Sequence, residues 1–168
     1  MANHLQFPER NSAYVATFDK GDLALPPAKK YIVVSCMDAR VEPAGQLGIE
    51  LGDAHVIRNA GGSAKEALRS IIISQRLLGT REIAVFHHTG CGMLLFSTDQ
   101  LRQVVKDAEP DNHAVSEHVD KIEFLEFGHL EQSVKDDVKF LQDNPLVLKG
   151  TTISGWIYDV TTGKVSSP

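Results

Sequence analysis

Three short apolar segments alternate along this chain with segments whose apolar residues recur at helical spacing. The strand candidates are residues 31–35, 54–58 and 82–87, in which apolar and β-branched residues predominate. The first helix candidate follows Gly61-Gly62 and runs from the cap residue Ser63 to Gly79. Strands that alternate with helices are typical of an α/β domain with a mainly parallel sheet. Continuous apolar strands indicate that such a sheet is covered on both faces.

The second half of the chain continues the helical pattern and ends in strands. Ser97 and Gln100 form a predicted capping box before a helix over 101–108, and residues 113–127 are the next helix candidate. A further helix stops at Asn144-Pro145 and has one apolar face, formed by Leu130, Val134, Val138 and Leu141. Residues 151–160 and 164–166 are the last strand candidates. The predicted fold is α/β, with a mainly parallel central sheet of about four strands plus a C-terminal edge strand, flanked by helices.

Residues 1–28 differ from the rest of the chain. They have no strand pattern and no apolar core of their own, and they end in Pro26-Pro27. We expect them to form an N-terminal arm, with a short helix near residues 9–18. Residues 29–168 then form a single α/β domain, a size that suffices for one compact core.

The composition argues against several classes of protein. The 168 residues include 17 basic and 22 acidic ones, a formal net charge of −5, which does not favour binding to nucleic acid or to an anionic membrane. No apolar stretch approaches the length of a membrane span, and the N-terminal residues lack the apolar core of a secretory signal. We therefore expect a cytoplasmic protein, in which both cysteines stay reduced and serve packing, catalysis or metal binding.

Both cysteines directly follow predicted strands. Cys36 begins the sequence CMDAR after the first strand, and Cys91 lies within HHTGCG after the third. Because the carboxyl ends of parallel strands meet at one edge of a sheet, we expect Cys36, Asp38, His88 and Cys91 to lie close together there. Thiolate and imidazole are ligands that suit zinc, and a set of three protein ligands leaves a position open, as in catalytic zinc sites.

Other cysteine chemistries agree less well with this spacing. A buried cysteine taken alone is most often a small hydrophobic residue, but two at strand ends beside His and Asp argue against packing alone. The chain has no C-x-x-C redox pair, and Glu42 stands where a cysteine phosphatase loop would have its arginine. A metal-free Cys–His nucleophile pair stays open, although it leaves Asp38, Arg40 and Cys91 without a role.

The motif C-x-D-x-R at residues 36–40, followed by H-x-x-C at residues 88–91, resembles the β-class carbonic anhydrases. That family also includes carbonyl sulfide and carbon disulfide hydrolases. The resemblance continues through residues 52–62 and 87–92 and through GWIYD at residues 155–159. It covers most of the chain between about 30 and 165, and the length is similar to that of the short members of the family.

The resemblance implies one Zn²⁺ per chain, bound by Cys36, His88 and Cys91. It also implies that Asp38 pairs with Arg40 in an open form and becomes a fourth zinc ligand in a closed form. In the open form this Asp–Arg dyad orients a zinc-bound hydroxide that attacks CO₂. The expected enzyme is thus a zinc lyase, a carbonate dehydratase that reversibly hydrates CO₂ to bicarbonate and a proton.

Three further positions bear on this expectation. Gly62 precedes the Ser63 helix, so its backbone N–H is a candidate for binding bicarbonate, although glycine is also the usual residue in such turns. His87 precedes His88 and points to the opposite face of a strand, so we expect it to be structural. Val33 stands where the allosteric form of the family has a tryptophan, which favours the open form in this chain.

The resemblance also implies a homodimer or homotetramer, in which residues 1–28 pack on a partner subunit. The alternative function is hydrolysis of carbonyl sulfide or carbon disulfide on the same zinc scaffold, because those substrates are linear triatomics like CO₂. A non-catalytic, zinc-stabilised binding module is a third possibility. The spacing of Asp38 and Arg40 argues against it, since a structural zinc site needs no orienting pair.

Overall fold

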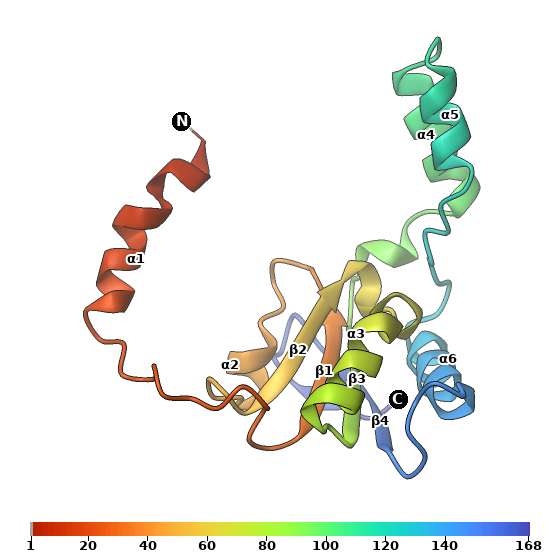
Figure 1. Cartoon of the computed structure of the whole chain (residues 1–168). Coiled ribbons are helices and arrows are strands. Elements are labelled where there is room, and N and C mark those ends of the chain that lie inside the picture. Colours follow the sequence, from red (N-terminus) through yellow and green to blue (C-terminus); the bar gives the residue numbers. More distant parts are fainter. Residues whose placement is uncertain (1) are drawn as a thin grey trace.

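A five-stranded sheet forms the centre of the molecule in a computed structural model that describes residues 2–168 (Figure 1). Its strand order is β2-β1-β3-β4-β5. The first four strands pair in parallel: β1 (Tyr31–Cys36), β2 (Ala54–Asn59), β3 (Glu82–His88) and β4 (Thr152–Tyr158). The last strand, β5 (Val165–Ser166), runs antiparallel to β4 at the edge. The predicted fold class is therefore confirmed, including the C-terminal edge strand.

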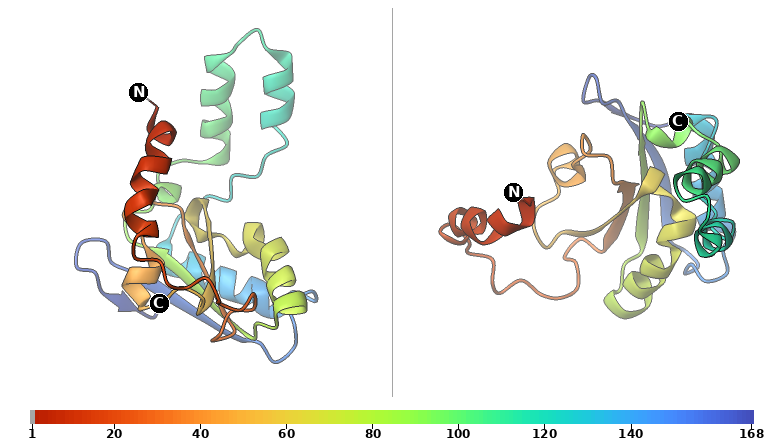
Figure 2. Two further views of the ribbon diagram at one scale, coloured as in Figure 1. Left: turned by 60° about the vertical axis from the view of Figure 1, so that its left-hand side comes forward. Right: turned by 90° about the horizontal axis from the view of Figure 1, so that it is seen from above.

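Helices cover the two faces of this sheet unequally. α3 (Ala64–Leu78) and α6 (Leu130–Asp143) lie on one face, and the short α2 (Pro43–Leu47) lies on the other (Figure 2). The main core between the sheet and the two long helices contains Ile32 and Val34 of β1. Val33, between them, points to the opposite face and packs in a second cluster with Phe86. Burial on both faces explains why β1 is mostly apolar, with Ser35 as its one buried polar residue.

Helix starts and ends follow the signals in the sequence. The Ser63 side chain accepts a hydrogen bond from the backbone of Glu66 at the start of α3, and Gly79 ends that helix at φ 77°. Ser97 and Gln100 form both bonds of a capping box before α4 (Thr98–Ala108). Two short 3₁₀ turns, η2 (Ala60–Gly62) and η3 (Gly92–Leu94), follow β2 and β3 at the carboxyl edge of the sheet. This edge is where the candidate functional residues gather.

α4 and α5 (His113–Val119) form a hairpin that stands away from the sheet (Figure 1). The prediction of one helix over residues 113–127 is wrong beyond Val119, because the chain there returns to the sheet edge as an irregular segment. Leu125 adopts a positive φ of 60° on this return, and the backbone N–H of Phe127 donates to the carbonyl of Met93. The Phe127 ring stacks on His87, with ring centroids 5.5 Å apart. These tertiary contacts override the helical pattern.

The N-terminal residues stand apart from the sheet on the side opposite to α6 (Figures 1 and 2). They contain η1 (Asn3–Gln6) and α1 (Phe7–Val15), so the helix begins earlier and ends earlier than the expected range of 9–18. α1 has no buried residue. The arm exposes a series of large apolar side chains, namely Leu5, Phe7, Tyr14, Val15, Phe18, Leu23 and Leu25. Within residues 2–168, no helix combines the length and the apolar character that a bilayer crossing requires.

Candidate metal centre

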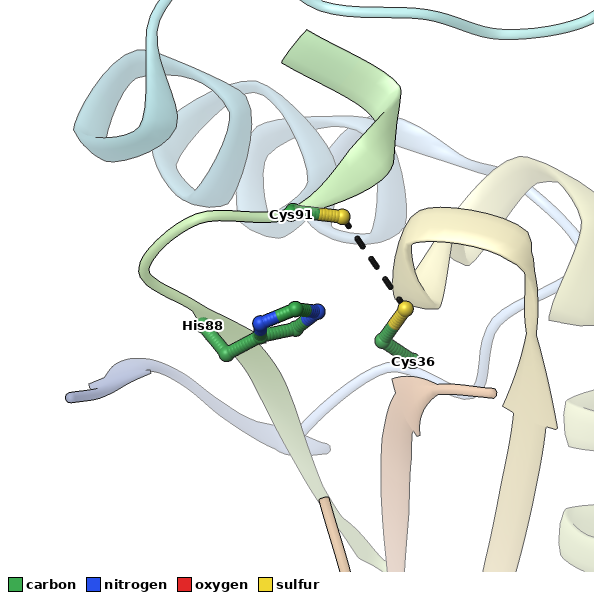
Figure 3. Close-up of side chains that lie close together, drawn as sticks. All are labelled: Cys36, His88 and Cys91. Carbon is green, nitrogen blue, oxygen red and sulfur yellow. Dashed lines mark hydrogen bonds between the residues drawn. The ribbon is translucent and has the colours of Figure 1, made fainter. Parts of the chain in front are cut away.

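Cys36, His88 and Cys91 come together at the carboxyl edge of the sheet, as the sequence predicted (Figure 3). Cys36 is the last residue of β1 and His88 the last of β3, and these two strands are parallel neighbours. Cys91 lies on the turn after β3, and its Sγ is 3.9 Å from the Sγ of Cys36. One ligand atom from each residue lies within 4.8 Å of the others, and all three residues are buried.

The orientation of His88 suits a metal ligand. Its Nδ1 lies 2.9 Å from the carbonyl oxygen of Thr89, which can only accept, so Nδ1 carries the proton and donates. Its Nε2 is buried and has no hydrogen-bond partner among residues 2–168. An unpaired buried nitrogen is costly, and Figure 3 shows this ring directed toward the two sulfur atoms. A metal ligand whose other ring nitrogen donates to a carbonyl is the usual arrangement in protein metal sites.

The two cysteine thiols are unequal. The contact with the Cys91 thiol and the hydrogen bond that the backbone N–H of Asp38 donates at 3.4 Å lower the pKa of Cys36. The same thiol contact and burial raise the pKa of Cys91. The surroundings of Cys36 therefore favour its thiolate form, and a thiolate is the form that binds metal.

Asp38 and Arg40 form a close ion pair beside this cluster. Arg40 donates from Nε to Oδ1 at 2.9 Å and from Nη2 to Oδ2 at 2.7 Å, and its backbone N–H also donates to Oδ1. These hydrogen bonds hold the pKa of the Asp38 carboxyl far below its usual range. Oδ2 of Asp38 lies 3.7 Å from Nε2 of His88, so an ionised carboxylate faces the candidate ligand nitrogen.

Arg58 is a site residue to which the sequence reasoning assigned no role. Its Nε donates to the carbonyl of Cys36 at 3.0 Å, and its Nη2 donates to the carbonyl of Asp38 at 2.9 Å. The neighbouring Asn59 accepts from the backbone of Met37 at 2.8 Å. Together they fix the backbone between the first cysteine and the carboxylate. Their position in the sequence could have indicated this role. Arg58 and Asn59 end the second strand, within residues 52–62, which resemble the β-class carbonic anhydrases.

The Gly61-Gly62 turn packs directly against the end of β1. Both residues have positive φ, 78° for Gly61 and 73° for Gly62. A Cβ on Gly62 would lie 3.0 Å from the carbonyl carbon of Ser35 and 3.1 Å from the nitrogen of Cys36. Both the backbone conformation and the close approach therefore require glycine. The substrate-binding role of Gly62 stays a prediction.

A cavity of about 290 Å³ opens beside the cluster. Cys36, Cys91, Asp38 and Gly61 form its polar side, and its other walls include the apolar side chains of Met37, Ala60, Met93 and Phe96. Such a mixed lining suits a small molecule of low polarity that reacts at a polar centre.

Comparison with known proteins agrees with this geometry. The family model for carbonic anhydrase matches residues 31–165. Beta-carbonic anhydrase 1 of Mycobacterium tuberculosis is 41% identical over 157 residues, which cover 93% of this chain and 91% of that protein. A carbon disulfide hydrolase of Acidithiobacillus thiooxidans is 34% identical over 160 residues, which cover 87% of this chain and 80% of that protein.

A solved structure supports the same relationship at the level of the fold. The carbonic anhydrase from Glaciozyma antarctica superposes with a TM-score of 0.95 and 51% sequence identity, and the match covers 99% of both chains. Sequence similarity of this extent, together with a shared fold over nearly the whole length, shows common ancestry. The chain therefore belongs to the β-carbonic anhydrase family.

Proposed function

We propose that this protein catalyses the reversible hydration of CO₂ to bicarbonate and a proton, with one Zn²⁺ per chain held by Cys36, His88 and Cys91. The observation that carries this proposal is the unpaired Nε2 of His88, which faces two cysteine sulfurs beside an ionised carboxylate. Two sulfurs and an imidazole nitrogen are a donor set that fits zinc. Zn²⁺ at such a site lowers the pKa of a bound water and so makes a nucleophile available near neutral pH.

Asp38 is the hydrogen-bond acceptor of this site. Its low pKa keeps it ionised at neutral pH, so it would accept a hydrogen bond from the attacking water and fix that water's orientation. Arg40 holds the carboxylate in place through its paired hydrogen bonds. If Asp38 rotates away from Arg40, its carboxylate becomes a fourth metal-ligand candidate, which would close the site.

The cavity walls and the glycine turn complete the proposed site. CO₂ has no net dipole, so the apolar side chains of Met93 and Phe96 can admit it without a desolvation cost. Bicarbonate carries a charge, and backbone N–H groups at the Gly61-Gly62 turn before α3 can offset that charge. We assign Gly62 to bicarbonate binding on this basis.

Stopped-flow measurement of CO₂ hydration, with metal analysis of the same preparation, tests the proposal. We expect turnover that scales with the zinc content, and none above buffer in a His88→Ala variant. A zinc-loaded wild-type protein without hydration activity would overturn the proposal.

Hydrolysis of carbonyl sulfide or carbon disulfide is the alternative function. The similarity to a carbon disulfide hydrolase at 34% identity favours it, and the apolar cavity walls suit these linear molecules as well. Sulfide release from both compounds should therefore be measured on the preparation used for CO₂. Fast sulfide release with negligible CO₂ turnover would replace the first proposal by the second.

We also propose that residues 1–28 pack on a partner subunit, in a homodimer or a homotetramer. The exposed apolar side chains of the arm support this proposal, since a series of this kind without a core of its own gains stability only when another surface covers it. A cytoplasmic location stays a prediction from the sequence.

A further inference from the structure

Met93 forms a buried wall of the cavity beside the candidate metal centre. It lies on η3, which begins directly after Cys91 (Figure 3), and it is 7% exposed. It packs in one apolar cluster with Cys36 and Cys91, and it lines the cavity of about 290 Å³. A molecule that enters this cavity and approaches the two sulfurs therefore meets the Met93 side chain.

The Met93 side chain has no room to retreat from the cavity. A Cβ placed on Gly61 would lie 2.9 Å from Cγ of Met93 and 3.3 Å from Cε1 of Phe127, so no space for a methyl group remains between Gly61 and these two side chains. The carbonyl oxygen of Met93 accepts a hydrogen bond from the backbone N–H of Phe127 at 3.3 Å, and the Phe127 ring stacks on His87. In such close packing, the wall cannot yield to a larger molecule without cost.

The other apolar residues of the cavity are less confined. Met37 is 65% exposed, and Ala60 has only a methyl side chain. Phe96 is partly exposed and meets Phe124 edge-on, with ring centroids 6.5 Å apart. Exposed side chains change rotamer readily, so the buried Met93 is the wall that fixes the size of the cavity next to the sulfurs.

We propose that Met93 is a specificity-determining residue, whose size admits CO₂ to the metal centre and disfavours its sulfur analogues carbonyl sulfide and carbon disulfide. Sulfur is larger than oxygen and its bond to carbon is longer, so each exchange of oxygen for sulfur makes the linear molecule longer and wider. A size difference of about one methylene group in an apolar pocket discriminates about 10- to 200-fold between substrates. This inference deepens the proposed function and rests on its assignment of the reaction to this cavity.

Met93→Ala tests the proposal through the ratio of two reactions. Hydrolysis of carbonyl sulfide adds one water to the carbon and breaks its bond to sulfur, so that COS and H₂O give CO₂ and H₂S. We expect Met93→Ala to raise kcat/KM for sulfide release, relative to kcat/KM for CO₂ hydration, about 10-fold at equal zinc content. A merely structural loss would lower both reactions together and leave this ratio unchanged.

Two further variants separate the size of Met93 from other effects. Met93→Leu keeps the volume of the side chain and should keep the wild-type ratio. Phe96→Ala widens the partly exposed side of the same cavity and should change the ratio less than Met93→Ala does. An unchanged ratio in Met93→Ala, or an equal rise in Met93→Leu or in Phe96→Ala, would overturn the inference.

Xenon binding gives a measure that needs no turnover. Removal of Cγ, Sδ and Cε of Met93 leaves a space beside Gly61 and Phe127, and a new apolar cavity of this kind binds xenon. Crystals of zinc-loaded Met93→Ala under xenon pressure should therefore show a xenon atom at this position, and wild-type crystals should not. A variant without xenon would show that the wall closes over the space, which also overturns the inference.

If Met93→Ala does not fold, the wild type decides, since its kcat/KM should fall from CO₂ through carbonyl sulfide to carbon disulfide. A wild type that hydrates CO₂, but has an equal or higher kcat/KM for carbon disulfide, would overturn the inference and leave the proposed function in place. A zinc-loaded wild type that turns over none of the three molecules would overturn the proposed function, and the xenon experiment would still test the wall.

Discussion

Arg40 binds both carboxylate oxygens of Asp38, at 2.9 Å to Oδ1 and 2.7 Å to Oδ2, while the same Nη2 donates to the carbonyl of Gly90 at 3.0 Å. Gly90 lies on the turn between His88 and Cys91. The guanidinium therefore connects the carboxylate that faces the candidate metal centre to the turn between two of the ligand candidates. Only a planar group with several N–H donors can make all these bonds together.

We predict that Arg40→Ala lowers kcat/KM for CO₂ hydration about 10- to 100-fold, because Asp38 loses its orienting partner. Arg40→Lys should recover only part of this loss, since an ammonium keeps the charge but not the paired geometry. Stopped-flow kinetics at equal zinc content is the measurement. Wild-type kcat/KM in Arg40→Ala would show that Asp38 needs no such partner.

The metal-ligand assignment predicts that Cys36→Ser, His88→Ala and Cys91→Ser each lose bound zinc. Each change removes one of three buried donors that lie within 4.8 Å of one another. Elemental analysis of purified protein measures the zinc, and His113→Ala, an exposed histidine at the start of α5, is the control. A variant that keeps one zinc per chain would remove its residue from the ligand set.

Gly62→Ala should destabilise the fold more than Gly163→Ala does. Both glycines have φ 73°, so each substitution carries the left-handed backbone cost of about 1–2 kcal/mol. A Cβ on Gly62 also meets the backbone of Ser35 and Cys36, whereas one on Gly163 meets nothing within 4 Å. The overpacking at Gly62 should add about 1–3 kcal/mol to its loss of unfolding free energy in urea titrations. Equal losses of unfolding free energy in the two variants would mean that the backbone of β1 moves to accommodate the added Cβ without cost.

We expect the hydrogen bonds of the Glu126 carboxylate to make the stability of the protein depend on pH. Glu126 accepts from both the backbone N–H and the hydroxyl of Thr98, at 2.6 Å each, and these bonds lower the pKa of its carboxyl from the usual 4.5. A pKa lowered by folding stabilises the protein above the unfolded pKa, and this stabilisation is lost as pH falls through the folded value. The wild type should therefore lose more unfolding free energy than Glu126→Gln between about pH 6 and about pH 3. Urea titrations across that range would contradict the prediction if the two proteins lose stability in parallel.

We predict that charged substitutions in the N-terminal arm change the oligomeric state. Replacing Phe7 and Val15, both exposed by 60% or more, with aspartate should lower the molar mass found by light scattering after size exclusion. Charged side chains at these positions cannot be covered by a partner without a large desolvation cost. Glu9→Lys, on the same helix, is a control for a charge change alone. An unchanged mass in the double variant would show that the arm does not hold subunits together.

Local patterns in the sequence predicted most of the sheet and helix boundaries, because they depend on neighbouring residues. The apolar run of β1, the caps at Ser63 and Ser97 and the stop at Gly79 all appear in the structure as predicted. The prediction of a helix over residues 113–127 was wrong for its second half, because residues distant in sequence hold that part of the chain in an irregular conformation. Phe127 stacks on His87 and Thr98 binds Glu126, contacts that no periodicity within the segment encodes.

The sequence alone determined the members of the candidate metal centre, since residue type, spacing and position after parallel strands suffice to bring Cys36, His88 and Cys91 to one edge. Only the tertiary structure decided how they are held. The bonds of Arg58 to two backbone carbonyls and of His87 to Gly62 join residues at least twenty positions apart, and their partners are backbone oxygens. Every residue has such an oxygen, so no pattern of side chains marks which one will be bound, and the folded packing alone makes that choice.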